Sequence, residues 1–203
     1  SVNFVIILMK IIGLTGGIGS GKSTISKEFK CNSIPVYDSD TRAKILMNSS
    51  KVLKAKLIEF FGSSTYSNGF LNKKYISNLI FNDSSALNKI NSIVHPEVFD
   101  DFINWKSRLN NDFVIYESAL IFESGLYKLN DYNILVISDI NKRIERVIKR
   151  DNIEKNDVLL KINNQWPDQK KIPLADYVFE NSSVNENRKL VSSLINHFNS
   201  IFV

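Results

Sequence analysis

Residues 16–24, Gly-Gly-Ile-Gly-Ser-Gly-Lys-Ser-Thr, constrain the fold of this chain more than any other feature. They follow an apolar run, Ile11–Leu14, that is typical of a buried strand, and they precede a segment with helical spacing of apolar residues, 22–30. Gly16 to Ser23 fits the pattern G-x-x-x-x-G-K-[ST]. Between a strand and a helix, such glycines let successive backbone N–H groups converge on a chain of phosphates, and the helix N-terminus adds its positive dipole end. The pattern therefore predicts a phosphate-binding loop, the P-loop.

The side chains of this loop indicate which ligand it holds. Lys22 is placed to reach the β- and γ-phosphates of a nucleotide, and the hydroxyl of Ser23 is placed to bind Mg²⁺. Thr24 is either a ligand of the α-phosphate or an ordinary threonine in the first turn of the helix. We therefore predict that ATP and Mg²⁺ bind here, with an ATP-binding set of Gly17, Ile18, Gly19, Ser20, Gly21, Lys22, Ser23 and Thr24.

Short apolar runs alternate with helical patterns along the rest of the chain. The runs predict buried strands at Ile11–Leu14, Pro35–Asp38, Phe113–Glu117, Asn133–Ser138 and Tyr177–Glu180. Helical spacing occurs at 22–30, 41–48, 142–150 and 191–198. Such alternation is typical of βαβ crossovers, so we predict an α/β fold in which a five-stranded parallel sheet is covered by helices on both faces.

The connection between the second and third predicted strands is too long for a single crossover. Residues 49–110 contain several short helical segments and the turn signal Asn68-Gly69, which together predict an inserted helical lobe. Residues 1–48 and 111–203 would then form the nucleotide-binding core. Residues 1–8 precede Met9 and are a possible non-native or upstream extension.

Composition excludes several classes of protein. Of the 203 residues, 43% are hydrophobic and 23% are charged, which is the balance of a globular chain. The single cysteine excludes an internal disulfide framework. The apolar run 4–9 ends at Lys10 and is much shorter than a membrane-spanning segment. We therefore expect a cytoplasmic protein. The net charge of +5 suits an anionic ligand but is also ordinary for a solvated surface. Basic residues are not interleaved with aromatic ones, so we expect no nucleic acid, and no membrane or obligate protein partner either.

Two acidic residues end predicted strands near the loop. In open α/β sheets ligands bind beyond the carboxyl ends of the strands, where Asp38 and Glu117 should lie. Asp38 suits a carboxylate that acts on a hydroxyl nucleophile or on Mg²⁺. Glu117 either reaches Mg²⁺ through water or pairs with a nearby base, and Asp40 is a candidate N-cap of a helix that begins at Thr41.

A row of arginines follows the fourth predicted strand. Arg143, Arg146 and Arg150 are spaced so that they share one face of a helix. The row is either a solvated face or part of a lid, at about residues 141–170, that clamps the phosphoryl group during transfer, because a guanidinium binds phosphoryl oxygens bidentately.

A series of motifs resembles the dephospho-CoA kinase family over essentially the whole chain from Met9 onward. In order, the motifs are LTGGIGSGKST, YDSD, IVHPEV, IYESALIFESGL, RVIKRD, the stretch around Gln165 and ADYVFEN. The resemblance implies a five-stranded P-loop kinase core, a lobe that receives the CoA precursor, and a lid. It implies that ATP phosphorylates the 3′-hydroxyl of dephospho-CoA to give CoA and ADP, the last step of CoA biosynthesis.

By the same resemblance, Asp38 is the acid that faces the ribose hydroxyl. Together with the P-loop pattern, this predicts Lys22, Asp38 and Arg146 as the catalytic residues. Arg146 and Arg150 are the lid arginines that bind ATP, and His95 belongs to the substrate-binding lobe. The sequence departs from the family pattern in the segments 118–120 and 181–183, which lack a common proline and glycine, and at Lys161, where an arginine is usual.

Two other functions remain as alternatives. A different small-molecule kinase, acting on a nucleoside, a nucleotide or a shikimate-like acceptor, shares every argument up to the lid. A nucleotide-binding switch of the GTPase type predicts an N-K-x-D motif and a D-x-x-G motif, and neither occurs. The sequence therefore favours a kinase, and only the motif series names its acceptor.

Overall fold

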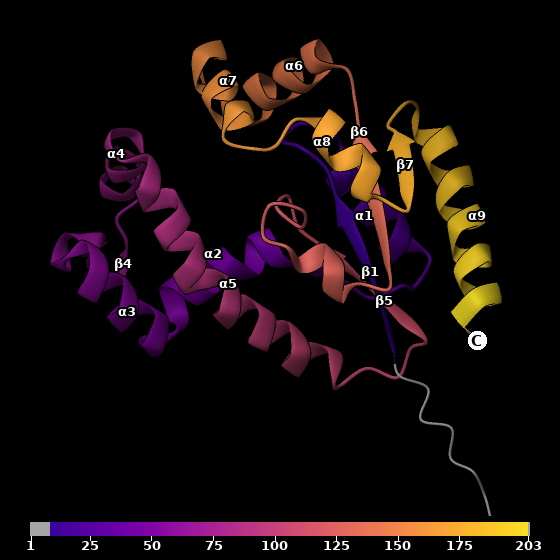
Figure 1. Cartoon of the computed structure of the whole chain (residues 1–203), viewed down its shortest axis with the longest axis horizontal. Helices are drawn as coiled ribbons and strands as arrows, with labels where there is room; N and C mark the ends of the chain where they lie inside the picture. Colours follow the sequence, from indigo (N-terminus) through magenta and orange to yellow (C-terminus); the bar gives the residue numbers. More distant parts are fainter. Residues whose placement is uncertain (1–8, 203) are drawn as a thin grey trace, which may run out of the picture. The chain divides into compact units, whose positions relative to one another are not determined.

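A parallel five-stranded sheet forms the centre of the nucleotide-binding part of the protein (Figure 1). The structure, a computed structural model, describes residues 9–202, so the possible extension at residues 1–8 lies outside the described residues. The strand order is β2-β5-β1-β6-β7. The strands span Lys10–Thr15 (β1), Val36–Asp38 (β2), Phe113–Glu117 (β5), Tyr132–Ile137 (β6) and Tyr177–Glu180 (β7), and every neighbouring pair is parallel.

The predicted α/β fold is confirmed, and each predicted strand lies within two residues of its observed bounds. β1 occupies the middle of the sheet, between β5 and β6. A central parallel strand is covered on both faces and therefore consists of an almost continuous apolar run. This is why residues 11–15 of β1 and all of β5 are buried.

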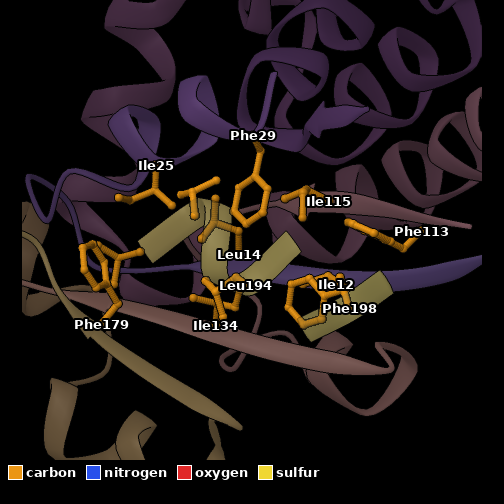
Figure 2. Close-up of a cluster of buried hydrophobic side chains, with 12 residues drawn as sticks. Ile12, Leu14, Ile25, Phe29, Phe113, Ile115, Ile134, Phe179, Leu194 and Phe198 are labelled. Atoms are coloured by element: carbon orange, nitrogen blue, oxygen red, sulfur yellow. The ribbon is translucent and has the colours of Figure 1, made fainter. Parts of the chain in front are cut away.

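One face of the sheet packs against two helices, α1 (Lys22–Cys31) and α9 (Val184–Phe202). Ile12 and Leu14 project from β1 into a cluster with Phe29 of α1 and Phe198 of α9, all of them fully buried (Figure 2). Each such side chain contributes about 1.5–3 kcal/mol when it leaves water. The strand before the P-loop and the helix after it are thus held by the same core, which fixes the two ends of the loop.

A second group of helices follows β6: α6 (Ile140–Asp151), α7 (Lys155–Asn163) and α8 (Asp168–Lys171). We call residues 140–171 the α6–α8 segment. α6 and α7 share a small apolar core of Ile144, Val147 and Val158. Short 3₁₀ helices at Leu126–Leu129 (η2) and Ile172–Leu174 (η3) complete this part of the chain.

The described residues divide into two compact units, residues 9–38 with 110–202, and residues 39–109. We call the second unit the lobe. It contains α2 (Ser39–Ser49), α3 (Lys51–Phe61), the 3₁₀ turn η1 (Ser63–Thr65), a hairpin of β3 (Tyr66–Ser67) and β4 (Phe70–Leu71), α4 (Lys73–Asn82) and α5 (Ser84–Lys106).

Three details of the lobe differ from the predictions. The lobe begins at residue 39 rather than 49, because α2 packs against α3 and α5. α2 begins at Ser39, so Asp40 lies in its first turn and is not the N-cap of a helix that begins at Thr41. The lobe also holds one long helix, because α5 continues for 23 residues through Pro96. Within residues 9–202, no helix is long and apolar enough to cross a membrane.

Candidate active site

The P-loop connects the end of β1 to the start of α1. α1 begins at Lys22, directly after Gly21, which has a left-handed backbone conformation. This confirms the predicted strand–loop–helix order and places the N-terminus of α1 at the loop. Ser23 is exposed in the first turn of α1, and Thr24 is half-buried, with its N–H donating to the carbonyl of Gly21 at 2.9 Å.

A buried amide ladder holds the end of the loop that leads into α1. Asn181, which follows β7, donates from Nδ2 to the carbonyl of Ser20 at 2.9 Å, and Asn187 of α9 donates to Oδ1 of Asn181 at 2.9 Å. A side chain at position 21 would overlap the amide of Asn181. Gly21 is therefore needed for the approach of Asn181, a reason that the loop pattern alone does not reveal.

The lysine of the loop pairs with the acid at the end of β5. Lys22 Nζ lies 2.8 Å from Glu117 Oε1, and both side chains are largely buried, with exposures of 12% and 5%. Of the two alternatives for Glu117, the structure therefore contains the pairing with a base. Asp38 ends β2 at the register position opposite Glu117, and Glu117 lies opposite Leu14 of β1. Two carboxylates thus end adjacent strands beside the P-loop, as the strand order requires.

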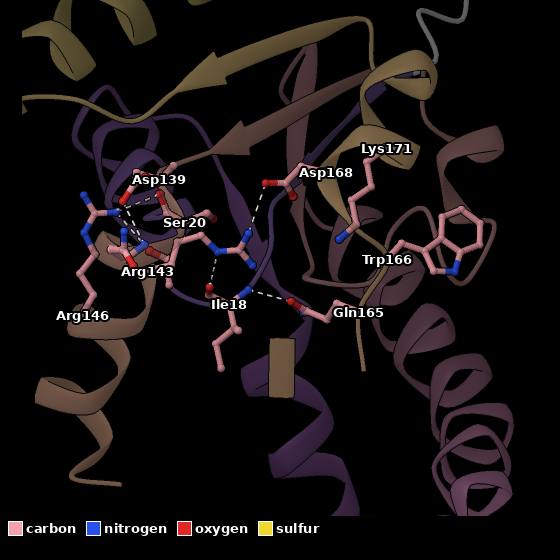
Figure 3. Close-up of polar contacts among 12 residues, drawn as sticks. Ile18, Ser20, Asp139, Arg143, Arg146, Gln165, Trp166, Asp168 and Lys171 are labelled. Atoms are coloured by element: carbon pink, nitrogen blue, oxygen red, sulfur yellow. Dashed lines mark hydrogen bonds and ion pairs between the residues drawn. The ribbon is translucent and has the colours of Figure 1, made fainter. Parts of the chain in front are cut away.

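The three arginines of the row have different partners, and Figure 3 shows Arg143 and Arg146 beside the loop. Arg146 donates from Nη1 to the carbonyl of Gly19 at 3.1 Å and to Oγ of Ser138 at 3.1 Å. Arg143 is buried and donates from Nε to the carbonyl of Ile18 at 3.0 Å. Arg150, in contrast, is exposed and donates to both carboxylate oxygens of Asp151, at 2.7 and 2.9 Å.

All three arginines lie on α6 at the predicted helical spacing, but only two of them contact the loop. The loop passes the first two turns of α6, so Arg143 and Arg146 reach it, whereas Arg150 pairs beyond it in the last turn. The hydrogen bonds that Arg150 donates to the Asp151 carboxylate raise the pKa of Arg150 above its usual value. Lys161 is exposed on α7, and its Nζ lies 3.9 Å from Asp151 Oδ2.

Three loop-holding residues were not assigned a role from the sequence. In the sequence, Arg143 is one member of the arginine row, Gln165 is part of a motif, and Asn181 is a departure from the family pattern. Gln165 Oε1 accepts a hydrogen bond from the N–H of Ile18 at 2.8 Å. The partners of these side chains are backbone atoms far away in the sequence, which no local pattern indicates.

His95 lies in the lobe, in the middle of α5 and directly before Pro96. Its side chain is half-buried, and this burial lowers its pKa, while the charge of Asp40 acts in the opposite direction. A neutral imidazole in this environment can donate one hydrogen bond and accept another. Its role toward a substrate stays a prediction.

The oxygen atoms near the loop fit a magnesium ion that is bound mainly by phosphate oxygens and water. Within residues 9–202, no group of three or more His, Cys, Asp or Glu side chains could hold a metal by itself. The Ser23 hydroxyl and the carboxylates of Asp38 and Glu117 offer oxygen atoms only. Mg²⁺ prefers oxygen ligands and is usually bound by one or two protein groups together with substrate phosphates.

Comparisons with known proteins agree with this geometry. The family model for dephospho-CoA kinase matches residues 10–187. A dephospho-CoA kinase of Porphyromonas gingivalis is 43% identical over 143 residues, which cover 70% of this chain and 71% of the relative. A dephospho-CoA kinase of Fusobacterium nucleatum is 36% identical over 174 residues, covering 85% and 90%. The crystal structure of TT1252 from Thermus thermophilus superposes with a TM-score of 0.79 at 31% identity, covering 93% of this chain and 97% of the other. This chain belongs to the dephospho-CoA kinase family.

Proposed function

We propose that this protein transfers the γ-phosphoryl group of ATP to the 3′-hydroxyl of dephospho-CoA, giving CoA and ADP. The observation that carries the kinase chemistry is the meeting of a P-loop lysine, two strand-end carboxylates and Arg146 at one edge of the sheet. The acceptor follows from the family, whose members in P. gingivalis and F. nucleatum are named dephospho-CoA kinases.

Each residue of the site has a definite task in this reaction. Lys22 exchanges Glu117 for the β- and γ-phosphate oxygens when ATP binds, and the amides of residues 17–24 surround the phosphates. Asp38 orients the ribose hydroxyl or accepts its proton. Arg146 stabilises the charge of the transferring phosphoryl group, and Arg150 joins it when it leaves Asp151.

Mg²⁺ is the cation that we expect to bind beside the P-loop together with ATP. The Ser23 hydroxyl would hold Mg²⁺ together with phosphate oxygens, and the ion would neutralise charge on the β- and γ-phosphates. Ser23 is exposed in the first turn of α1, next to Lys22, so the hydroxyl is accessible to an ion that arrives with ATP. We expect EDTA to abolish the activity and added Mg²⁺ to restore it.

The acceptor site and the lid are assigned to the remaining parts of the chain. We assign binding of the CoA precursor to the lobe, with His95 as one contact, and closure over ATP to residues of about 141–170. Closure of such a segment would exclude water and limit the hydrolysis of ATP. We expect a cytoplasmic enzyme that acts on small molecules without nucleic acid, membrane or an obligate protein partner.

The decisive experiment is a coupled assay of ADP release. Purified protein with MgATP is offered dephospho-CoA, shikimate, or one of a panel of nucleosides and nucleotides, and the product is identified by mass spectrometry. We expect rapid ADP release only when dephospho-CoA is the acceptor. The Lys22→Met variant, purified in parallel, controls for contaminating kinases. Equal rates with several acceptors would reject dephospho-CoA as the specific substrate and leave a broader small-molecule kinase.

A further inference from the structure

Ile18, at the tip of the P-loop, contacts the α6–α8 segment at three points, of which Figure 3 shows the two polar ones. Its N–H donates to Gln165 Oε1 at 2.8 Å, and its carbonyl accepts from Arg143 Nε at 3.0 Å. Its side chain packs against the apolar core that α6 and α7 share. Both backbone polar groups and the side chain of one loop residue are therefore engaged by the same distant segment.

The glycines on either side of Ile18 fit this contact. A side chain at Gly17 would overlap the guanidinium of Arg143, and one at Gly19 would overlap the backbone of Arg143. Gly19 also has a φ of +78°, which L side chains rarely adopt. Part of the glycine pattern is thus explained by the close approach of α6 and does not require a phosphate.

Residues 166–171, at the C-terminal end of the segment, form ion pairs and a hydrogen bond within the same unit. The buried charge of Arg143 is balanced by Asp168 Oδ2, 3.2 Å from its Nη1. The N–H of Trp166 donates to Glu123 Oε1 at 3.0 Å, and the same oxygen lies 2.9 Å from Nζ of the fully buried Lys171. A buried guanidinium without a partner would be strongly destabilising, so Asp168 is part of what keeps Arg143 on the loop.

We propose that Ile18, Arg143 and Gln165 couple the geometry of the P-loop to the packing of α6 and α7, with Arg143 and Gln165 acting as positioning residues. If α6 and α7 move away from the loop, either both hydrogen bonds to Ile18 break and its side chain leaves the apolar core, or the tip of the loop moves with them. Because coupling between sites is reciprocal, a nucleotide that fixes the loop also stabilises α7, and loss of the contacts weakens nucleotide binding.

Amide hydrogen exchange tests this coupling without any phosphoryl transfer. In the wild type, saturation with MgAMP-PNP should slow exchange in α7, residues 155–163. Gln165→Met keeps the length of the side chain, and Arg143→Met keeps an unbranched apolar stem without the guanidinium, so neither variant can make its hydrogen bond to Ile18. In each variant we expect most of the nucleotide-induced protection of α7 to disappear. The affinity for MgAMP-PNP, measured by calorimetry, should fall by about 10-fold, as expected for the loss of about one hydrogen bond.

Matched controls separate coupling from general damage. Gln169→Met and Lys149→Met change exposed side chains of α8 and α6 and should keep the protection of α7. Arg143→Lys keeps the charge opposite Asp168 and should retain part of the protection that Arg143→Met loses. If Arg143→Met does not fold, as judged by circular dichroism, Gln165→Met decides the question alone, because it leaves the buried ion pair intact.

The outcomes distinguish this inference from the proposed function, on which its kinetic consequence rests. Absence of nucleotide-induced protection of α7 in the wild type, or full protection in Gln165→Met, overturns the coupling even if dephospho-CoA is phosphorylated. Loss of protection in the variants supports the coupling even if dephospho-CoA proves not to be the acceptor. If the function also holds, kcat should fall more than KM for dephospho-CoA rises, because the variants alter ATP geometry rather than the lobe.

Discussion

The P-loop and the helix N-termini of the lobe are stabilised by polar contacts of opposite kinds. The loop is held by side chains that lie between 125 and 161 residues away in the sequence, from Arg143, Gln165 and Asn181. The helices of the lobe are capped by side chains only two or three residues from their partners, at Ser50, Asn72 and Asp83. The shape of the phosphate-binding loop is thus a property of the complete unit, whereas the starts of the lobe helices are specified locally.

The largest effect should come from a residue that neither holds the loop nor belongs to the lobe. In Asp38→Asn, kcat with dephospho-CoA should fall by about 10²–10⁴-fold, because a positioned general base is lost. The affinity for MgAMP-PNP, measured by calorimetry, should stay near that of the wild type. Asp100→Asn, at an exposed position of α5, serves as the control. Full activity of Asp38→Asn would remove this carboxylate from the mechanism.

The next effect concerns the long-range contacts of the loop. Asn181→Leu removes the donor to the carbonyl of Ser20, which keeps only the longer bond from Arg146 Nη1 at 3.4 Å, and it removes the acceptor of the buried Asn187 side chain. We expect the free energy of unfolding, from urea denaturation, to fall by about 2–3 kcal/mol. The affinity for MgAMP-PNP should fall as well, because the loop loses the hydrogen bond from Asn181 that fixes its backbone next to Gly21. A stable variant with wild-type affinity would show that the loop keeps its shape without this ladder.

The smallest effect is expected from a local contact of the lobe. Asn72 caps α4 by accepting from the N–H of Tyr75 at 3.1 Å, and loss of such a cap costs about 1 kcal/mol. In Asn72→Ala the free energy of unfolding should fall by this amount, while the affinity for MgAMP-PNP should not change. A reduced nucleotide affinity in this variant would contradict the separation between the locally specified lobe and the loop.

The same contrast explains how much the sequence could predict. The five strands were found because a buried parallel strand needs a continuous apolar run, and the P-loop was found because its chemistry depends on glycines and one lysine at fixed spacing. The pairing of Lys22 with Glu117 was one of two open alternatives, since strand order brings several acids to the same edge.

Other features had no local signal. The apolar face of α2 does not say whether it packs on the sheet or on α5, so the lobe was predicted to begin ten residues too late. Helical spacing placed Arg143, Arg146 and Arg150 together, but only the fold decides which of them reaches the loop. The roles of Gln165 and Asn181 depend on backbone atoms of Ile18 and Ser20, and such partners leave no pattern in the sequence.

The central position of β1 has a consequence for the newly made chain on the ribosome. Both neighbours of β1, β5 and β6, are translated after the whole lobe, so the lobe can acquire its locally specified helices while β1 has no partner. Asn181 and Asn187, which hold the loop beside Gly21, are made later still. A nascent or prematurely terminated chain that lacks them should not form the finished nucleotide site, so we expect ATP binding to be acquired near the end of translation.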